Sequence, residues 1–173
     1  MRSGLRSKGT HLLLIRQAQD SDFPRILEIN TTEEEKTSRI DLARITQLDS
    51  WSDYHRVLAV EDVIVGFLLV MSEASDYDGD NFRWFVERYS RFLYVDRIVI
   101  DRTFARRGAG SALYADLIKF AATQSWSTLC CEINVSPPNP VSHAFHAGFG
   151  FKEVGRSGTA GAPKVVSYQV AEI

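Results

Sequence analysis

Apolar residues along this chain follow two different spacings, and each spacing predicts a different kind of element. Short apolar runs predict strands at 12–16, 55–60, 63–71, 92–100, 128–135, 149–155 and 165–170. Apolar positions three or four residues apart predict helices at 20–29, 39–48 and 108–124, and a further helix that begins at Asn139. Residues 81–91 are expected to form a helix or an irregular lid, and Glu61-Asp62 to form a tight turn.

Two of these elements are well defined by their residues. The helix at 108–124 has one apolar face, made of Ala109, Leu113, Leu117, Phe120 and Ala121. In the strand at 128–135, neighbouring side chains point to opposite faces, so Glu132 shares a face with Cys130 and Asn134. The order of strands and helices along the chain therefore predicts a sheet packed against helices.

The segment from Ile98 to Leu113 carries the most specific chemistry in the sequence. An apolar strand runs into a short basic loop, then into Gly108 and Gly110, and then into the helix. Glycines let a backbone approach a ligand closely, and the free N–H groups of a helix's first turn point toward negative charge. This order predicts an anion site, with nearby positive charge from Arg102, Arg106 and Arg107.

Three phosphate-binding motifs contain glycines of this kind. A dinucleotide fingerprint needs a small residue three places after the second glycine, where this chain has Leu113. A P-loop needs Gly-x-x-x-x-Gly-Lys-Ser/Thr, which does not occur here. The run from Ala105 to Gly110 instead resembles the Gln/Arg-x-x-Gly-x-Gly/Ala pyrophosphate loop of the GNAT superfamily of N-acetyltransferases. For this motif alone, an ordinary glycine-containing turn is the alternative.

A second motif, about thirty residues later, resembles the same superfamily. Residues 139–151 follow a proline pair that ends the preceding strand. They are similar to the GNAT segment Asn-x-x-Ser/Ala-x-x-Phe-Tyr-x-x-x-Gly-Phe, with His146 where many members have tyrosine. Two motifs at this spacing are far more specific than either one alone, and the close resemblance extends over residues 91–154.

The resemblance implies both the fold and the co-substrate. The implied fold is of the mixed α/β (α+β) class, with a strongly twisted mixed sheet, helices on both faces, and strands 92–100 and 128–135 splayed apart at their ends. The pantetheine arm of acetyl-CoA lies in that gap, and no metal takes part. The implied coenzyme-binding residues are Ile98, Val99, Ile100, Arg106, Arg107, Gly108, Ala109, Gly110, Ser111, Asn139, Ser142 and Phe145. For Asn139 the alternative is a plain helix cap.

The reaction implied is direct attack of an amine on the thioester, which needs positioning and acid–base help but no covalent intermediate. Ala105 replaces the Gln or Arg of the motif, so one side-chain contact to the phosphates is missing, for which Arg106 is a substitute. The tyrosine that commonly protonates the thiolate is replaced by His146, whose imidazolium can donate a proton to the same sulfur. A structural, half-buried histidine is the alternative.

The general base is left open between two carboxylates. Asp96 is expected to share a strand face with Tyr94, Ile98 and Ile100, and Glu132 lies on the neighbouring strand. Either carboxylate can draw a proton from an ammonium group, directly or through water. The alternative for each is a structural pairing with an arginine such as Arg97.

An aromatic segment lies immediately before the coenzyme strand, where the superfamily usually builds its acceptor pocket. Aspartates and an asparagine alternate with the aromatic residues, which suits a small cationic or polar amine. The residues expected to bind the acceptor are Tyr77, Asn81, Trp84 and Phe85. The alternative is that the aromatic residues belong to the core.

The composition excludes several other classes of protein. The chain has 173 residues, of which 45% are hydrophobic and 24% charged, and it fits one domain at 11–173. The segment at 1–10 is expected to be a flexible, polar tail, and it lacks the apolar run of a signal peptide. A net charge of −2 and the lack of any run of about 20 apolar residues give no drive toward nucleic acid or membrane. The adjacent Cys130 and Cys131 point to opposite faces, and no metal-ligand spacing occurs, which predicts a cytoplasmic protein without disulfides.

Two functions from different classes follow. The first is an N-acetyltransferase that moves acetyl from acetyl-CoA to a primary amine, with a small molecule as the expected acceptor. The second is a GNAT-fold module that binds or senses acyl-CoA without turnover, which Ala105 and the missing tyrosine favour. The sequence does not identify the acceptor, and it leaves a homodimer open.

Overall fold

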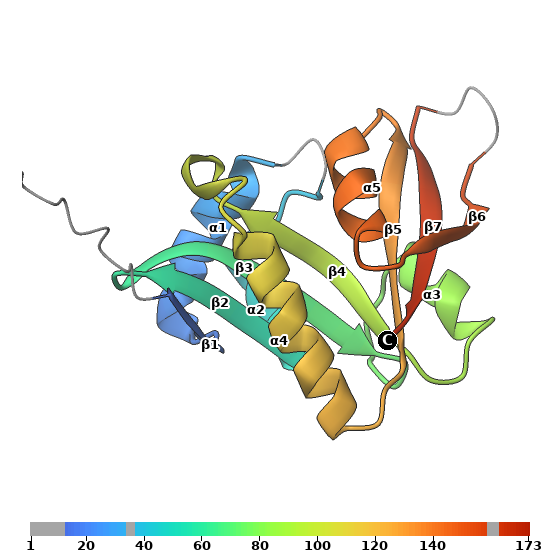
Figure 1. Cartoon of the computed structure of the whole chain (residues 1–173), viewed down its shortest axis with the longest axis horizontal. Coiled ribbons are helices and arrows are strands. Elements are labelled where there is room, and N and C mark those ends of the chain that lie inside the picture. The colour runs from blue at the N-terminus through green and yellow to red at the C-terminus, as the bar shows by residue number, and fades with distance from the viewer. Residues whose placement is uncertain (1–12, 34–36, 159–162) are drawn as a thin grey trace, which may run out of the picture.

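The structure is a computed structural model that describes residues 13–33, 37–158 and 163–173, so the expected tail at 1–10 lies outside it. Its sheet has seven strands in the order β1-β2-β3-β4-β5-β7-β6 (Figure 1). Their bounds are β1 (Leu13–Gln17), β2 (Tyr54–Val60), β3 (Val63–Ser72), β4 (Leu93–Ile100), β5 (Thr128–Ser136), β6 (Lys152–Arg156) and β7 (Val165–Glu172). Strands β4 and β5 pair in parallel, and the other neighbours pair antiparallel.

The helices agree with the expected order, and their ends differ for local reasons. Their bounds are α1 (Phe23–Thr31), α2 (Leu42–Trp51), α3 (Asp80–Val86), α4 (Ala109–Thr123) and α5 (Pro140–Ala147), with single 3₁₀ turns η1 (Asp20–Asp22) and η2 (Arg102–Phe104). Helix α2 begins later than expected because the Asp41 carboxylate accepts the Arg44 N–H at 2.8 Å and caps the helix there. The expected element at 81–91 is a helix that ends at Val86.

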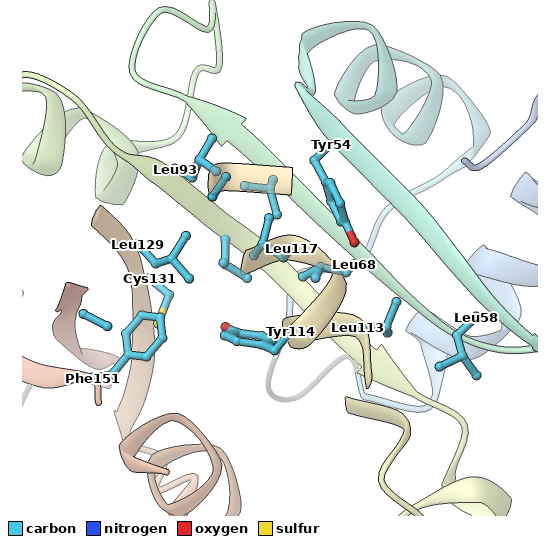
Figure 2. Close-up of a cluster of buried hydrophobic side chains, with 14 of the residues drawn as sticks. Tyr54, Leu58, Leu68, Leu93, Leu113, Tyr114, Leu117, Leu129, Cys131 and Phe151 are labelled. Atoms are coloured by element: carbon cyan, nitrogen blue, oxygen red, sulfur yellow. The ribbon is translucent and has the colours of Figure 1, made fainter. Parts of the chain in front are cut away.

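The sheet carries helices on both faces, as expected. Helices α1, α2 and α3 cover one face through apolar clusters that include Phe23, Ile45 and Phe85. Helix α4 covers the other face, where Leu113 and Leu117 are fully buried against the strands (Figure 2). The apolar face expected for this helix is therefore confirmed.

Two local predictions are also confirmed. Glu61 and Asp62 both have positive φ angles, 50° and 66°, which is the backbone of a two-residue hairpin turn. Cys130 and Cys131 are free thiols on opposite faces of β5, because Cys130 packs in the cluster of α3 and Cys131 in the cluster of α4.

The gap between β4 and β5 is the feature that positions the site. The two strands pair only at Leu93 with Leu129 and at Tyr94 with Cys130. Beyond these residues the strands separate, so their facing backbone edges are unpaired with each other. The expected splay is therefore present.

A β-bulge in β4 changes which side chains share a face. Leu69 pairs with Arg97 and Val70 pairs with Val95, so Asp96 has no partner on β3. The alternation is interrupted there, and Ile98 and Ile100 pack toward α4 instead. The prediction that Asp96 shares their face is wrong, because the sequence pattern assumed an uninterrupted strand.

Candidate active site

A cavity of about 550 Å³ opens where β4 and β5 separate and reaches the first turns of α4 and α5. Most of the residues predicted for the site meet there. Those that line it are Asp96, Ile98, Val99, Ile100, Arg106, Gly108, Ala109, Gly110, Ser111, Glu132, Asn139, Ser142, Phe145 and His146. Arg107, Tyr77, Asn81, Trp84 and Phe85 do not line the cavity.

The loop before α4 is shaped to present backbone N–H groups. Arg106 and Gly108 have left-handed backbone, with φ of 61° and 82°. The first helical hydrogen bond of α4 joins the Ala112 N–H to the Gly108 carbonyl at 2.9 Å, so the N–H groups before Ala112 have no partner within the helix. Gly108 caps the helix without a side-chain bond. Unpaired N–H groups at a helix N-terminus form a site for an anion such as a phosphate.

The two glycines have different reasons to be glycine. A Cβ built on Gly108 meets nothing within 4 Å, so its positive φ is the constraint. A Cβ built on Gly110 lies 3.2 Å from the Phe145 ring, so this glycine lets α5 pack closely against the start of α4. The run from Ala105 to Gly110, called the anion loop below, is therefore in direct contact with the second motif at residues 139–151.

The three arginines of the expected basic patch are not equivalent. Arg102 is held by α1 and the residues after it, because its Nε lies 3.0 Å from a Glu33 carboxylate oxygen and its Nη2 donates to the Thr32 carbonyl. Arg107 lies over the Phe104 ring at 5.3 Å and is not itself part of the cavity lining. Arg106 is exposed, lines the cavity, and forms no ion pair with a described carboxylate. It is the arginine best placed to meet a bound anion.

Glu132 lies on β5 and is held by two uncharged donors. The Tyr94 hydroxyl donates to one carboxylate oxygen at 2.5 Å, and the Asn81 amide donates to the other at 3.1 Å. Burial raises the pKa of the Glu132 carboxyl to about 6, and these two hydrogen bonds oppose the effect. A pKa near 6 gives a group that releases and accepts a proton close to neutral pH.

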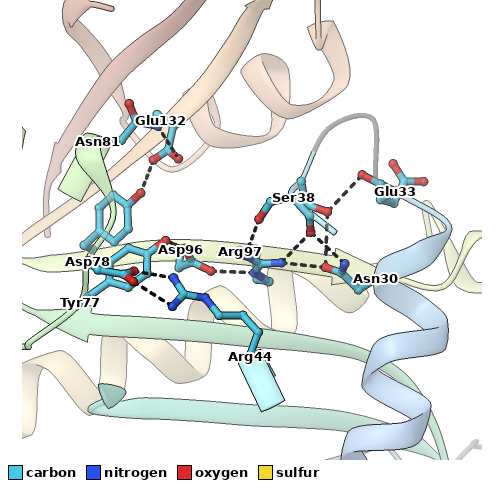
Figure 3. A network of polar contacts seen from close by, with 12 residues as sticks. Asn30, Glu33, Ser38, Arg44, Tyr77, Asp78, Asn81, Asp96, Arg97 and Glu132 are labelled. Atoms are coloured by element: carbon cyan, nitrogen blue, oxygen red, sulfur yellow. Dashed lines mark hydrogen bonds and ion pairs between the residues drawn. The ribbon is translucent and has the colours of Figure 1, made fainter. Parts of the chain in front are cut away.

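Asp96 is held mainly by charge (Figure 3). Its carboxylate accepts Arg97 Nε at 2.6 Å and the Tyr77 hydroxyl at 2.5 Å. The buried Arg97 guanidinium also donates to Asn30 and Ser38, which ties the bulge of β4 to the connection between α1 and α2. The pairing with Arg97 that the sequence left as an alternative is therefore present.

His146 is buried, with only 4% of its surface exposed, and its ring lies edge-on to those of Tyr114, Phe145 and Phe151. Its Nδ1 lies 2.8 Å from the Ser142 carbonyl oxygen, so in the neutral ring Nδ1 carries the proton and Nε2 carries none. Burial lowers the pKa of the His146 imidazole. The geometry thus favours the neutral ring, and the role of His146 as proton donor stays a prediction.

The four residues expected to bind the acceptor lie behind the cavity wall. Tyr77 and Asn81 reach it indirectly, through their hydrogen bonds to Asp96 and Glu132. Trp84 stacks on Tyr168 with ring centroids 4.1 Å apart, and Phe85 is fully buried. Most of the aromatic segment therefore belongs to the core, as the alternative had it.

Other lining residues carry no local motif. Glu33 and Thr37 come from the connection between α1 and α2, and Cys131 and Asn134 come from β5. Glu33 has 17% of its side chain exposed and pairs with Arg102. Only the packing of distant segments brings Glu33 to the cavity.

The described part of the chain contains no group of three or more His, Cys, Asp or Glu residues that could hold a metal ion. None of its helices combines the length and the apolar character needed to cross a membrane.

Several solved structures share this fold. Ard1 from Thermoplasma volcanium has a TM-score of 0.74 at 18% identity, over 93% of this chain and 97% of that one. The ribosomal-protein-S18-alanine N-acetyltransferase from Escherichia coli has a TM-score of 0.70 at 16% identity, over 94% of each chain. Salmonella typhimurium yncA, solved with its cofactor acetyl-CoA, has a TM-score of 0.67 at 17% identity, over 93% of this chain and 94% of that one.

At these identities the structures establish a shared fold. A search of curated proteins with the sequence found no match. The model of the acetyltransferase (GNAT) family, however, matches residues 12–151, which include β4, the anion loop, β5 and α5. This family uses acetyl-CoA as its co-substrate, and the cavity has the unpaired strand edges and helix N–H groups that such a ligand needs. The chain belongs to the acetyltransferase (GNAT) family.

Proposed function

We propose that this protein transfers acetyl from acetyl-CoA to the nitrogen of a primary amine, by direct attack within a ternary complex, and that the acceptor is a small molecule. One observation carries the proposal: a single cavity joins the anion loop of α4 to the carboxyl group of Glu132, with the separated edges of β4 and β5 between them. A donor and an amine bound in this cavity meet in the gap between the strands.

The anion loop is proposed to hold the pyrophosphate of acetyl-CoA. The N–H groups of Ala109, Gly110 and Ser111 precede the first helical hydrogen bond, and Arg106 adds positive charge beside them. The free edge of β4 offers backbone partners for the pantetheine arm. Asn139 caps α5 by accepting the Ser142 N–H at 3.3 Å, and its place in the lining adds a coenzyme contact to that role.

Glu132 is proposed as the general base. It takes a proton from the ammonium group of the acceptor, directly or through water, and the neutral nitrogen then attacks the thioester carbonyl carbon. The nitrogen loses its second proton to solvent, the C–S bond breaks as the tetrahedral intermediate collapses to the amide, and the coenzyme thiolate leaves and takes up a proton. Tyr94 and Asn81 position the carboxyl group through their hydrogen bonds to it.

His146 is proposed as the donor of the proton to the thiolate. In this role the reactive species is the imidazolium, whose Nε2–H is the free proton because Nδ1–H is bonded to Ser142. Burial lowers the pKa of His146 and raises that of Glu132, so it opposes both charged forms that the reaction uses, the imidazolium and the carboxylate. An acid limb from Glu132 and an alkaline limb from His146 would then both appear in the pH profile.

A second candidate is a module that binds acyl-CoA without turnover. The observation that favours it is the same histidine, which is packed among aromatic rings and is mainly neutral, together with Ala105 in the phosphate loop. Under either function the two buried, free cysteines support a reducing, cytoplasmic location.

A thiol-release assay with acetyl-CoA across a panel of primary amines tests the proposal, with calorimetric titration of acetyl-CoA on the same preparation. Acetyl-CoA binding with amine-dependent thiol release supports the transferase, and mass spectrometry of the product locates the acetyl group on nitrogen. Binding with no release on any amine supports the sensing module. Absence of acetyl-CoA binding would refute both.

A further inference from the structure

We infer that the acceptor side of the cavity selects amines that carry no carboxylate on the carbon next to the nitrogen. The inference rests on the proposed N-acetyl transfer and deepens it by naming the acceptor class. It comes from the charges that face the cavity on the side of the sheet opposite to α4 (Figure 3).

Two carboxylates, Asp96 and Glu132, line the cavity from the two separated strands. Both face the side of the sheet that α1, α2 and α3 cover, because their partners Tyr77, Tyr94 and Asn81 lie there. The coenzyme loop lies at the start of α4, on the other face. The donor and the acceptor therefore approach the gap from opposite faces, and the acceptor comes closest to the Glu132 carboxylate, with the buried Asp96 carboxylate and its partner Arg97 behind it.

The two carboxylates also interact with each other. The negative charge of Asp96 is one of the causes that raise the pKa of Glu132. An ammonium group placed between them is attracted by both, whereas a carboxylate carried beside that ammonium is repelled by both.

The arginines on this side already have partners. Arg97 donates to Asp96, Asn30 and Ser38, and 4% of its side chain is exposed. Arg102 is bonded to Glu33 and to the Thr32 carbonyl. Among the described residues, the remaining arginine of the lining is Arg106, which belongs to the anion loop. On the acceptor side, each described arginine of the lining therefore already has a protein partner. None of them is left to pair with an α-carboxylate.

Simple amines and compounds in which the neighbouring group is a neutral amide fit this arrangement. Free α-amino acids do not, because their carboxylate lies two bonds from the reacting nitrogen. The expected preference for the uncharged form is roughly tenfold or more in kcat/KM, since the repulsion acts inside a partly desolvated cavity.

The test compares three forms of one compound: the best amine of the panel, the same amine with an α-carboxylate, and the corresponding carboxamide. The carboxamide matches the carboxylate in size, so it separates charge from bulk. Rates are expressed per concentration of neutral amine, because the three amines differ in pKa. Calorimetry with the coenzyme A complex gives the binding order independently of turnover, with phenethylamine, phenylalanine and phenylalaninamide as probes if no amine is acetylated.

Each outcome is decisive. Preference for the amine and the carboxamide over the acid supports the inference, and the same order of binding without any transfer supports it while the proposed function fails. Equal acceptance of the acid and the carboxamide overturns the inference while acetyl transfer stands. Absence of binding by all three overturns both.

A variant pair assigns the effect to the cavity. Asp96→Asn should raise the acceptance of the acid relative to the carboxamide by about tenfold, because one of the two repelling charges is gone. Asp78→Asn is the matched control: Asp78 is a nearby exposed carboxylate, paired with Arg44 and outside the cavity lining, and its removal should leave the ratio unchanged. Equal ratios in wild type and Asp96→Asn would refute the role of Asp96. If Asp96→Asn does not fold, the wild-type comparison decides alone.

Discussion

Replacing Glu132 by glutamine separates two consequences of burying this carboxyl group. Burial raises its pKa from an ordinary 4.5 to about 6. A general base must be ionised, so kcat/KM of the wild-type enzyme should fall on the acid side as Glu132 takes up a proton around pH 6, apart from the alkaline limb expected of His146. Glutamine keeps the shape and accepts hydrogen bonds but takes no proton. Activity should fall by about 10²-fold or more, and the limb near pH 6 should disappear.

The same pKa predicts how stability changes with pH. Because the pKa in the folded state is higher than in the unfolded chain, the folded state holds the proton more tightly. The resulting stability is fully present below pH 4.5 and is lost as the pH rises through about 6. The difference between 4.5 and about 6 corresponds to about 2 kcal/mol of unfolding free energy. Wild type should therefore lose about 2 kcal/mol on going from acid to alkaline pH that Glu132→Gln does not lose.

Urea unfolding followed by tryptophan fluorescence, at about pH 4 and about pH 8, measures this difference between the two proteins. The chain has three tryptophans to report it. Glu132→Gln should gain stability relative to wild type at the higher pH, while its activity is low there. Equal pH dependence of the two proteins would refute the burial argument. An acid limb that persists in Glu132→Gln would assign the base to another group.

Three further predictions concern the coenzyme loop and the histidine. Gly108→Ala should cost about 1–2 kcal/mol of stability because of its left-handed backbone, with little change in acetyl-CoA affinity, whereas Gly108→Asp should lose affinity in calorimetry through repulsion of the pyrophosphate. Arg106→Ala should weaken binding several-fold at low salt, and titrations at rising ionic strength should show the loss shrinking. His146→Phe should lower turnover by about 10²-fold if His146 is the proton donor, with His146→Tyr more active; intact turnover with a lower melting temperature would show a packing role instead.

The parts of the fold that were predicted correctly depend on short stretches of sequence. The turn at Glu61-Asp62 and the helix start at Asn139 are decided by neighbouring residues, and the structure has both. The apolar face of α4 follows from residues within one helix. The anion loop is also local, since Gly108 supplies the left-handed residue that begins α4. Such features need no knowledge of which segments meet in three dimensions.

The features that were missed depend on segments far apart in the sequence. The bulge at Asp96 exists only in the register of β4 against β3, and the alternation of apolar residues does not reveal it. Glu33 reaches the cavity because it pairs with Arg102, many residues later. The aromatic segment was assigned to the acceptor because of its position, but Phe85 packs in the core and the Tyr77 hydroxyl is bonded to Asp96, outside the cavity lining. Tertiary contacts decide these roles.

The structure also gives a physical reason to choose between the two carboxylates that the sequence left open. Asp96 is bonded to the Arg97 guanidinium at 2.6 Å, so its carboxylate already serves as the counter-charge of a buried cation. Glu132 accepts only from the neutral Tyr94 hydroxyl and the neutral Asn81 amide. Protonation of Glu132 leaves no buried cation without a partner. Ionisation of Glu132 is already opposed by burial and by the charge of Asp96. This difference supports the proposal that Glu132, rather than Asp96, is the general base.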